Sequence, residues 1–340
     1  MSLTEQSPVI ADLGDPAPSG RARERLGRFV PYAARYGLIA FLLLLIAVFS
    51  ILQPQIFFTF RMAKTILVQQ TVIMLLSLSV LPIVVVGEFD LSIGNVLGFA
   101  AVLIAALGEK SLGGWPTLLL TVLACAAIGG INGFLVSVLK VPSMIATLGV
   151  GLAVGGLTVG VSGGETLVSG IPNLIPDMSS TIVLGVSLAV WIVFALCLVT
   201  YAVFEHTPTG RRLYAVGGSQ VVARLAGIRV TRLKFLAFTA GAALVAVAGA
   251  LNLGQAGGAS PSFGPSLLLP AYAAVFLGST TIRPGFFNVW GTVVATLVLA
   301  VGFTGLTLEG VPYWVEPVFD GVALIIGVLL SRGEVTRAGR

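Results

Sequence analysis

The sequence predicts an all-α, polytopic membrane protein with about ten transmembrane helices and both termini in the cytoplasm. Composition is the first reason: of 340 residues, 56% are hydrophobic and 10% are charged, whereas soluble domains carry roughly 25% charged residues. The second reason is a mean hydropathy of +1.03, because this much apolar material exceeds what one soluble domain buries. The third reason is the number of long apolar segments.

Each predicted span approaches the length of about 20 residues that a helix needs to cross the hydrocarbon core. The predicted spans are 37–53, 66–86, 91–108, 116–138, 143–162, 181–203, 235–255, 267–281, 287–307 and 313–330. The third and eighth spans are short, so they are the candidates for broken or re-entrant segments buried in protein.

The distribution of cations supports an even number of spans. Cytoplasmic loops of membrane proteins are enriched in Lys and Arg. With ten spans and a cytoplasmic N-terminus, all but three of the 19 cations fall in cytoplasmic segments, and the exceptions are Arg61, Lys64 and Lys110. Adding or removing one early span would scramble this pattern.

The two ends of the chain are predicted to be cytoplasmic tails. In the first tail, 1–35, the first 20 residues mix Pro, Ser, Gly and acidic residues without periodicity, which indicates disorder. Basic residues then precede the first span: Arg21, Arg23, Arg25, Arg28 and Arg35. The second tail is 332–340. The transmembrane domain is therefore predicted over 36–331, and its longest cytoplasmic loop is 205–234.

The residue inventory excludes several kinds of chemistry. The two cysteines, Cys125 and Cys197, lie in apolar runs without metal-ligand spacing, so we interpret them as packing residues. His206 is the only histidine, and the chain has neither an HExxH motif nor a P-loop. These absences disfavour an intramembrane enzyme. We predict no metal and no cofactor on this chain, and any ATP and Mg²⁺ must be bound by a separate subunit.

Two carboxylates lie in the sequence GEFDLSIG at 87–94, between the second and third spans. A charge near the bilayer centre costs at least about 2.5–3.5 kcal/mol, so Glu88 and Asp90 must reach the interface or face a polar cavity. Asp90 can N-cap the third span by accepting from the amide of Ser92 or Ile93, and contact with a substrate or gate is the alternative. For Glu88 the alternatives are a solvated interfacial carboxylate and a gate residue.

Neutral polar side chains within the spans have two possible roles. They can join helices by hydrogen bonds, each contributing about 0.6 kcal/mol, or they can line a hydrophilic path. The scarcity of charge suits a neutral cargo better than an ion. The candidate path or gate residues are Glu88, Asp90, Ser92, Asn95, Asn132 and Thr147, and Gln69, Gln70 and Ser143 are further polar residues in the spans.

The basic loop at 205–234 is predicted to contain two short helices. The first covers 207–216 after a proline-containing start. Gly217 and Gly218 are predicted to break the helix. Ser219 is then suited to N-cap the second helix.

The second short helix is predicted to end at Gly227, which is a C-terminal glycine signal. Val221, Val222 and Leu225 have the spacing of one helix side, while Arg224 points elsewhere. This apolar side predicts docking onto a cytosolic partner. An amphipathic element lying on anionic lipid is the alternative.

Four motifs in chain order carry a resemblance to a known family. The first is GEFDLSIG at 87–94, and the second is INGFLVSVLKVPSMIATLG at 131–149. The third, in the basic loop, consists of Gly210, Arg211, Tyr214, Ala215, Gly217, Gly218, Arg224, Leu225, Gly227 and Ile228. The fourth is AYAAVFLGSTTIRPGFFNVWGT at 271–292. The set resembles the inner-membrane permeases of bacterial ABC importers for monosaccharides, the ribose-type permeases.

The resemblance implies the ABC importer permease fold in the bacterial inner membrane. It also implies two cytosolic ATPase subunits, an extracytoplasmic solute-binding protein, and a second permease protomer that is identical or different. The loop at 207–228 then corresponds to coupling helices seated in the ATPases. The implied coupling residues are Gly210, Arg211, Tyr214, Gly217, Gly218, Val221, Val222, Arg224, Leu225 and Gly227.

The chain departs from the family pattern at two places. Glu88 replaces a glycine, and the fourth motif is altered at Ser279, Thr281, Arg283 and Pro284. The function we expect is import of a pentose, hexose or polyol. A nucleoside or other small solute is the alternative within the family. An ion-coupled secondary transporter is the alternative outside it, and the lack of a paired-charge relay in the spans disfavours that class.

Overall fold

The computed structural model describes the backbone of residues 20–338 and the side chains of residues 35–330. The predicted disorder of the first 20 residues falls almost entirely outside the described backbone. The side chains of Arg21, Arg23, Arg25 and Arg28 and of the cations of the C-terminal tail lie outside the described side chains.

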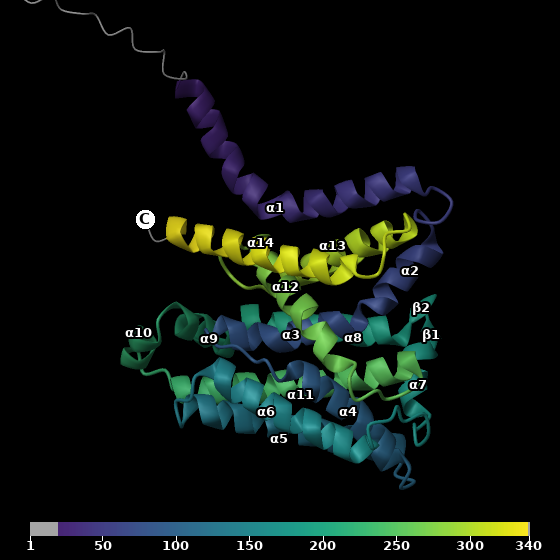
Figure 1. The fold of residues 1–340 in the computed structure, drawn as a ribbon. Coiled ribbons are helices and arrows are strands. Elements are labelled where there is room, and N and C mark those ends of the chain that lie inside the picture. The colour runs from purple at the N-terminus through teal and green to yellow at the C-terminus, as the bar shows by residue number, and fades with distance from the viewer. Residues whose placement is uncertain (1–19, 339–340) are drawn as a thin grey trace, which may run out of the picture.

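Helices make up almost all of the regular structure (Figure 1). Their bounds are α1 Gly20–Leu52, α2 Phe60–Gln69, α3 Thr71–Val85, α4 Ile93–Gly108, α5 Gly114–Ser137, α6 Ser143–Ser162, α7 Leu174–Ser180, α8 Leu188–Tyr201, α9 Pro208–Gly218, α10 Gln220–Leu225, α11 Val230–Ala256, α12 Leu268–Gly278, α13 Val289–Leu308 and α14 Val315–Ala338. The π-helical turn η1 covers Ala202–His206, and the 3₁₀ turn η2 covers Gly264–Leu267. Strands β1 (Ile182–Val183) and β2 (Val186–Ser187) pair antiparallel.

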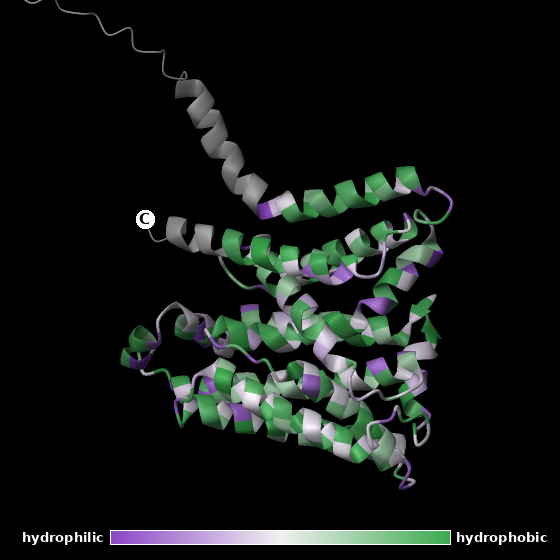
Figure 2. Cartoon of the chain, in the orientation of Figure 1, coloured by the Kyte–Doolittle hydropathy of each residue, from purple (hydrophilic) through white to green (hydrophobic). Residues whose placement is uncertain are grey.

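The long helices run side by side, with α9 and α10 at one end of the bundle and α7, β1 and β2 at the other (Figure 1). We call these the α10 end and the α7 end. Helix α11 packs on α3, α4 and α5, and its apolar span is 61% buried, against 6% for that of α1. Helix α11 therefore lies in the centre of the molecule and α1 at its periphery. Hydrophobic residues dominate the helices, and polar residues gather in the loops (Figure 2).

Six helices in the described part of the chain are long and apolar enough to cross a membrane: α1, α5, α6, α8 with η1, α11 and α13. Helices α2 and α3 pass the same test together, but they are bent by 44° where they meet. The chain is therefore a multi-pass membrane protein. The count of ten crossings also needs α4, α12 and α14, and it stays a prediction.

The third and eighth predicted spans correspond to helices that are shorter than a full span. Helix α4 has 16 residues and α12 has 11, against about 20 for a full span. Most residues of both helices are buried. Both are therefore apolar helices enclosed by protein.

Two predicted spans differ in their start or continuity. The second is broken at Gln70, where Gln255 Nε2 donates to Thr71 Oγ1 at 2.7 Å and so contacts the first residue of α3. The sixth was predicted from residue 181, but residues 182–187 form the β1–β2 hairpin. Its turn holds Gly185 at φ +81°, and the Ser187 side chain caps α8.

The glycines of α6 differ in their packing. A Cβ at Gly151 would lie 3.1 Å from Ser92 Cα, and one at Gly155 would lie 3.0 Å from Asn95 Oδ1. These two glycines allow α4 to approach α6 closely. The other glycines of this run, Gly149, Gly156 and Gly160, do not contribute to this contact, because a Cβ at those positions meets nothing within 4 Å.

Loops predicted on the same side of the membrane meet at the same end of the bundle. At the α10 end, Arg283 pairs with Glu205, Lys234 pairs with Glu88, and the Ile282 amide donates to the Arg35 carbonyl. At the α7 end, Gln53 donates to Glu309, Ser169 donates to Glu109, and Leu167 bridges to Ala259. The first set joins predicted cytoplasmic segments and the second set joins predicted external ones.

Candidate translocation and coupling site

The chain between α3 and α4 forms a non-helical connection, which we call the linker (residues 87–92). It begins at Gly87, whose φ of +81° lies in the left-handed region that glycine tolerates. The amide of Gly87 donates to the Val84 carbonyl, and the amide of Glu88 donates to Ile83. Non-helical backbone at membrane depth requires partners for its polar groups, and the neighbouring helices supply them.

Helix α6 provides two of these partners. The Phe89 amide donates to Ser143 Oγ at 3.3 Å, and the Leu91 amide donates to Thr147 Oγ1 at 3.0 Å. Thr147 itself is fully buried and donates to the Ser143 carbonyl. These side chains therefore hold the linker in place.

Helix α12 provides a partner that the sequence analysis missed. The Tyr272 hydroxyl accepts from the Asp90 amide at 2.8 Å and donates to the Asp90 carbonyl at 3.0 Å. Tyr272 is 4% exposed. The available signal was a single tyrosine within the otherwise apolar run 267–278, because a buried tyrosine usually finds a partner for its hydroxyl.

The Asp90 side chain lies at the centre of a buried polar cluster. Its Oδ1 accepts from the Ser92 amide at 2.8 Å and from Ser92 Oγ at 2.6 Å, and Asn132 Nδ2 of α5 donates to Ser92 Oγ at 2.8 Å. The hydrogen bond predicted from the Ser92 amide is present. The predicted N-cap role of Asp90 is wrong, however, because α4 begins at Ile93 rather than at residue 91 and Ser92 occupies the N-cap position.

Glu88 forms an ion pair with Lys234 near the start of α11. The Glu88 side chain is 14% exposed and that of Lys234 is 9% exposed, so the interpretation of Glu88 as a solvated carboxylate is wrong. A charge buried this far is strongly destabilising when its partner is removed. The available signal was that both residues were predicted to lie at the cytoplasmic ends of their spans.

Asn95 stands apart from this cluster. It is partly exposed on α4, its side-chain amide lies against Gly151 and Gly155, and no hydrogen bond to this side chain is found among the described residues. The structure thus brings Asp90, Ser92, Asn132 and Thr147 together around the linker. It places Glu88 with α11 and leaves Asn95 with a free amide at the α4–α6 contact.

Helices α9 and α10 at the α10 end form what we call the coupling element (residues 207–228). Ser219 caps α10 as predicted, with its Oγ accepting from the Val222 amide at 3.4 Å, and Gly227 adopts a φ of +79° after the helix. The predicted break at Gly217 and Gly218 is wrong, because both residues belong to α9. The chain breaks at Ser219 instead.

The side of α10 predicted to be apolar is open to solvent. Val221 is 68% exposed, Val222 63% and Leu225 85%. Arg224 and Arg211 are exposed as well. A short, capped helix therefore presents three large apolar side chains at one end of the bundle.

Two glycines allow the coupling element to pack closely on the membrane domain. A side chain at Gly217 would clash with the carbonyl oxygen of Val85, the last residue of α3, and one at Gly210 would clash with the Phe204 backbone. A Cβ at Gly218 meets nothing within 4 Å. Gly217 thus brings α9 into contact with α3 two residues before the linker begins.

Tyr214 joins the coupling element to the segment between α12 and α13. Its hydroxyl donates to the Phe287 carbonyl at 2.7 Å. Burial, with the nearby Glu205 carboxylate, raises the pKa of Tyr214 to about 12, so the hydroxyl stays a donor near neutral pH. Arg283 bonds both carboxylate oxygens of Glu205, at 2.5 and 2.6 Å, and lies 5.7 Å from the Tyr214 ring centroid. Arg283, one of the departures from the family pattern, thus lies at this contact and pairs with Glu205.

Aromatic rings continue this contact to the linker. Phe89 stacks on Tyr272 and on Phe276, with centroids 5.9 and 6.2 Å apart, and Phe276 meets Phe287 edge to face at 5.3 Å. The Phe287 carbonyl is the group that accepts from Tyr214. The linker and the coupling element are therefore connected by contiguous packed groups as well as by α3.

Comparisons with known proteins agree with this architecture. The chain matches the family described as branched-chain amino acid transport system, permease component, over residues 62–329. It is 30% identical over 293 residues to the ribose import permease of Escherichia coli strain K12, covering 85% of this chain and 91% of that protein.

Two further relatives are similar over most of their length. The ribose import permease of Bacillus subtilis strain 168 is 30% identical over 292 residues, covering 86% of this chain and 90% of the relative. The autoinducer 2 import system permease of Photorhabdus luminescens is 30% identical over 253 residues, covering 73% and 76%. No solved structure matches the chain. The match over residues 62–329 and these relatives show that the chain belongs to the family of permease components of ABC import systems.

Proposed function

We propose that this chain is the permease subunit of an ABC importer that moves a monosaccharide or a polyol into the cytoplasm. The ribose import permeases among its relatives support a sugar as cargo. The neutral polar groups around the linker suit a neutral solute, which needs hydrogen bonds without strong charge to bind reversibly. A nucleoside or other small solute is the alternative cargo.

The observation that carries the proposal is the connection between an exposed docking helix and a buried polar linker. The apolar side of α10, formed by Val221, Val222 and Leu225, is the proposed seat of a cytosolic ATPase that binds ATP and Mg²⁺. Helix α9 is rigidly packed on α3 through Gly217 and Val85. A displacement of α10 by the ATPase is therefore passed to the linker rather than absorbed.

The linker is the proposed gate. Asp90, Ser92, Asn132 and Thr147 bond one another or the linker backbone, so they hold one arrangement of this segment. The Glu88–Lys234 pair joins the linker to the helix that follows the coupling element. Asn95, whose amide is free among the described residues, is the proposed contact for cargo beside α6.

The proposed assembly lies in the bacterial inner membrane with the α10 end facing the cytoplasm. A second permease protomer completes the path, and an extracytoplasmic solute-binding protein delivers cargo at the α7 end. The apolar residues exposed on the peripheral helices contact lipid or the second protomer. No nucleic acid takes part.

Uptake of radiolabelled ribose into proteoliposomes tests this function. The vesicles contain the full chain together with its cognate ATPase and solute-binding protein. We expect uptake only when ATP and all three components are present. Uptake by the chain alone under an ion gradient would contradict the proposal and favour a secondary transporter. ATP-dependent uptake of a nucleoside in place of ribose would support the importer and change its cargo.

The docking role is tested by Leu225→Asp. The substitution adds a charge to the apolar side of α10 without touching the core, since Leu225 is 85% exposed. We expect the variant to insert normally, to lose binding of the ATPase and to lose uptake. Leu184→Asp is the matched control, because Leu184 is equally exposed, at 85%, but lies in the hairpin at the α7 end. Equal ATPase binding by both variants would contradict docking at α10.

A further inference from the structure

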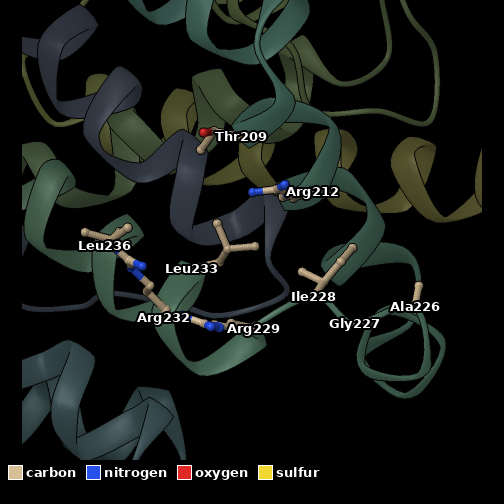
Figure 3. A pocket seen from close by; sticks show the side chains of 9 residues that line it. All are labelled: Thr209, Arg212, Ala226, Gly227, Ile228, Arg229, Arg232, Leu233 and Leu236. Atoms are coloured by element: carbon tan, nitrogen blue, oxygen red, sulfur yellow. The ribbon is translucent and has the colours of Figure 1, made fainter.

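A basic cavity lies at the α10 end, between α9, the turn after α10 and the start of α11 (Figure 3). Its volume is about 500 Å³. Arg212 lines one side, and Arg229 and Arg232 line the other. The lining contains no acidic residue, and no ion pair to these arginines is found among the described residues. Three uncompensated cations thus surround one cavity.

The cavity continues into an apolar groove. A second cavity, of about 440 Å³, shares Thr209, Leu233 and Leu236 with the first. Apart from two threonines, every side chain that lines it is apolar. The basic cavity is therefore the polar end of a longer cavity whose lining is mostly apolar.

The groove follows the direction of the membrane-spanning helices. On α11 its lining extends from Leu233 to Val247, which is about 21 Å along a helix. One leaflet of the hydrocarbon core is about 15 Å thick. The groove is lined by Leu196 and Val199 of α8 and by Val203 of η1. Val199 and Val203 are exposed on the surface of the molecule, so the groove is accessible from lipid.

We propose that the joined cavities bind one anionic phospholipid from the leaflet at the α10 end, with its phosphate among the three arginines and an acyl chain in the groove. Guanidinium groups bind phosphate oxygens in bidentate geometry, and basic pockets at helix ends bind anionic lipid headgroups. A carboxylate from a partner protein would satisfy the arginines, but it would leave the apolar groove empty.

The position of the lipid gives it a structural role. Thr209 and Arg212 belong to α9, whereas Arg229 and Arg232 lie at the start of α11. A bound phosphate would therefore tie the coupling element to the central helix. This role does not depend on which cargo the protein transports.

Native mass spectrometry of the full chain tests the site with phosphatidylglycerol and with phosphatidylcholine of the same acyl chains. We expect preferential retention of phosphatidylglycerol. Arg212→Gln with Arg232→Gln should weaken its retention at least about tenfold, from the charge removed. The control pair, Arg35→Gln with Arg61→Gln, removes the same charge away from the cavity and should retain the lipid.

The groove is tested separately by Ala240→Phe, which fills it beside Leu236. Ala153→Phe, on an exposed position of α6 outside both cavities, is the control. We expect loss of lipid retention only with Ala240→Phe. Equal behaviour of the two alanine variants, or unchanged retention in the arginine variant, would overturn the proposal.

Two further outcomes would assign the cavity to another ligand and overturn the proposal. Displacement of phosphatidylglycerol by millimolar inorganic phosphate would indicate a site for free anions. Loss of ATPase binding by the arginine variant, with lipid retention unchanged, would indicate a protein contact. Resistance to inorganic phosphate together with intact ATPase binding would support the lipid site.

Discussion

The Tyr272 hydroxyl satisfies both backbone groups of Asp90 at a buried position. Replacing Tyr272 with Phe leaves that amide and that carbonyl without their partner at almost unchanged volume. Because a buried polar group without a partner costs about 1–3 kcal/mol, we expect Tyr272→Phe to lower the thermal unfolding midpoint and to reduce transport.

Tyr201→Phe is the control for this prediction. Tyr201 packs against His206 and Trp290, but its hydroxyl makes no hydrogen bond within the described part of the chain. We expect a midpoint close to that of the unmodified protein. Equal midpoints for the two tyrosine variants, measured by differential scanning fluorimetry, would contradict the role given to the Tyr272 hydroxyl.

Asp90 offers a second test at a single residue. Asparagine keeps an Oδ1 acceptor for the Ser92 amide and hydroxyl, whereas alanine removes it. Without that acceptor, the buried amide and hydroxyl of Ser92 lose their partner, which costs about 1–3 kcal/mol. We therefore expect Asp90→Asn to keep most of the stability and uptake, and Asp90→Ala to lose both. Equal loss of uptake in the two variants would show instead that the charge itself is required.

Sequence reasoning succeeded at this site where the contact is local. The hydrogen bond from the Ser92 amide to Asp90 spans two positions and follows from the local side chain–backbone bonding that aspartate favours. The pairing of Glu88 with Lys234 spans 146 positions, and that of Asp90 with Tyr272 spans 182. Such pairs depend on how helices pack, and no spacing rule within a segment predicts them.

At the scale of secondary structure, the coupling element shows the same difference between local features, which the sequence predicts, and long-range contacts, which it does not. Ser219 and Gly227 act through their own backbone conformation, so the sequence predicted the start and the end of α10. The predicted break at Gly217 and Gly218 is wrong, because two consecutive glycines favour a turn only when no tertiary contact fixes their backbone conformation. Here the close approach to Val85 keeps Gly217 within α9.

Alanine substitutions at the two adjacent glycines of α9 are therefore expected to have different effects. Gly217→Ala places a methyl group against the Val85 carbonyl and must displace α9 from α3. We expect a lower thermal midpoint and loss of ATP-dependent uptake. Gly218→Ala meets nothing within 4 Å and is the matched control, with an unchanged midpoint. A normal midpoint and normal uptake in Gly217→Ala would show that this contact does not transmit movement.

At the scale of the whole molecule, apolar length and cation placement predicted which loops share an end. Arg283 and Glu205 lie in loops that were assigned to the same side, and they form an ion pair. The bend between α2 and α3 and the hairpin before α8 could not be predicted, because hydropathy records only how apolar a segment is. It does not record where the segment turns.

The orientation of the bundle is tested by two cysteines introduced at equally exposed leucines, Leu184→Cys and Leu225→Cys. Both leucines are 85% exposed, and the two native cysteines are buried, so a maleimide reagent should label only the introduced thiols. The α7 end is predicted to be external and the α10 end cytoplasmic. In intact spheroplasts, a membrane-impermeant maleimide should therefore label Cys at 184, whereas Cys at 225 should react only after permeabilisation. The reverse pattern would invert the molecule in the membrane and place the coupling element out of reach of any cytosolic ATPase.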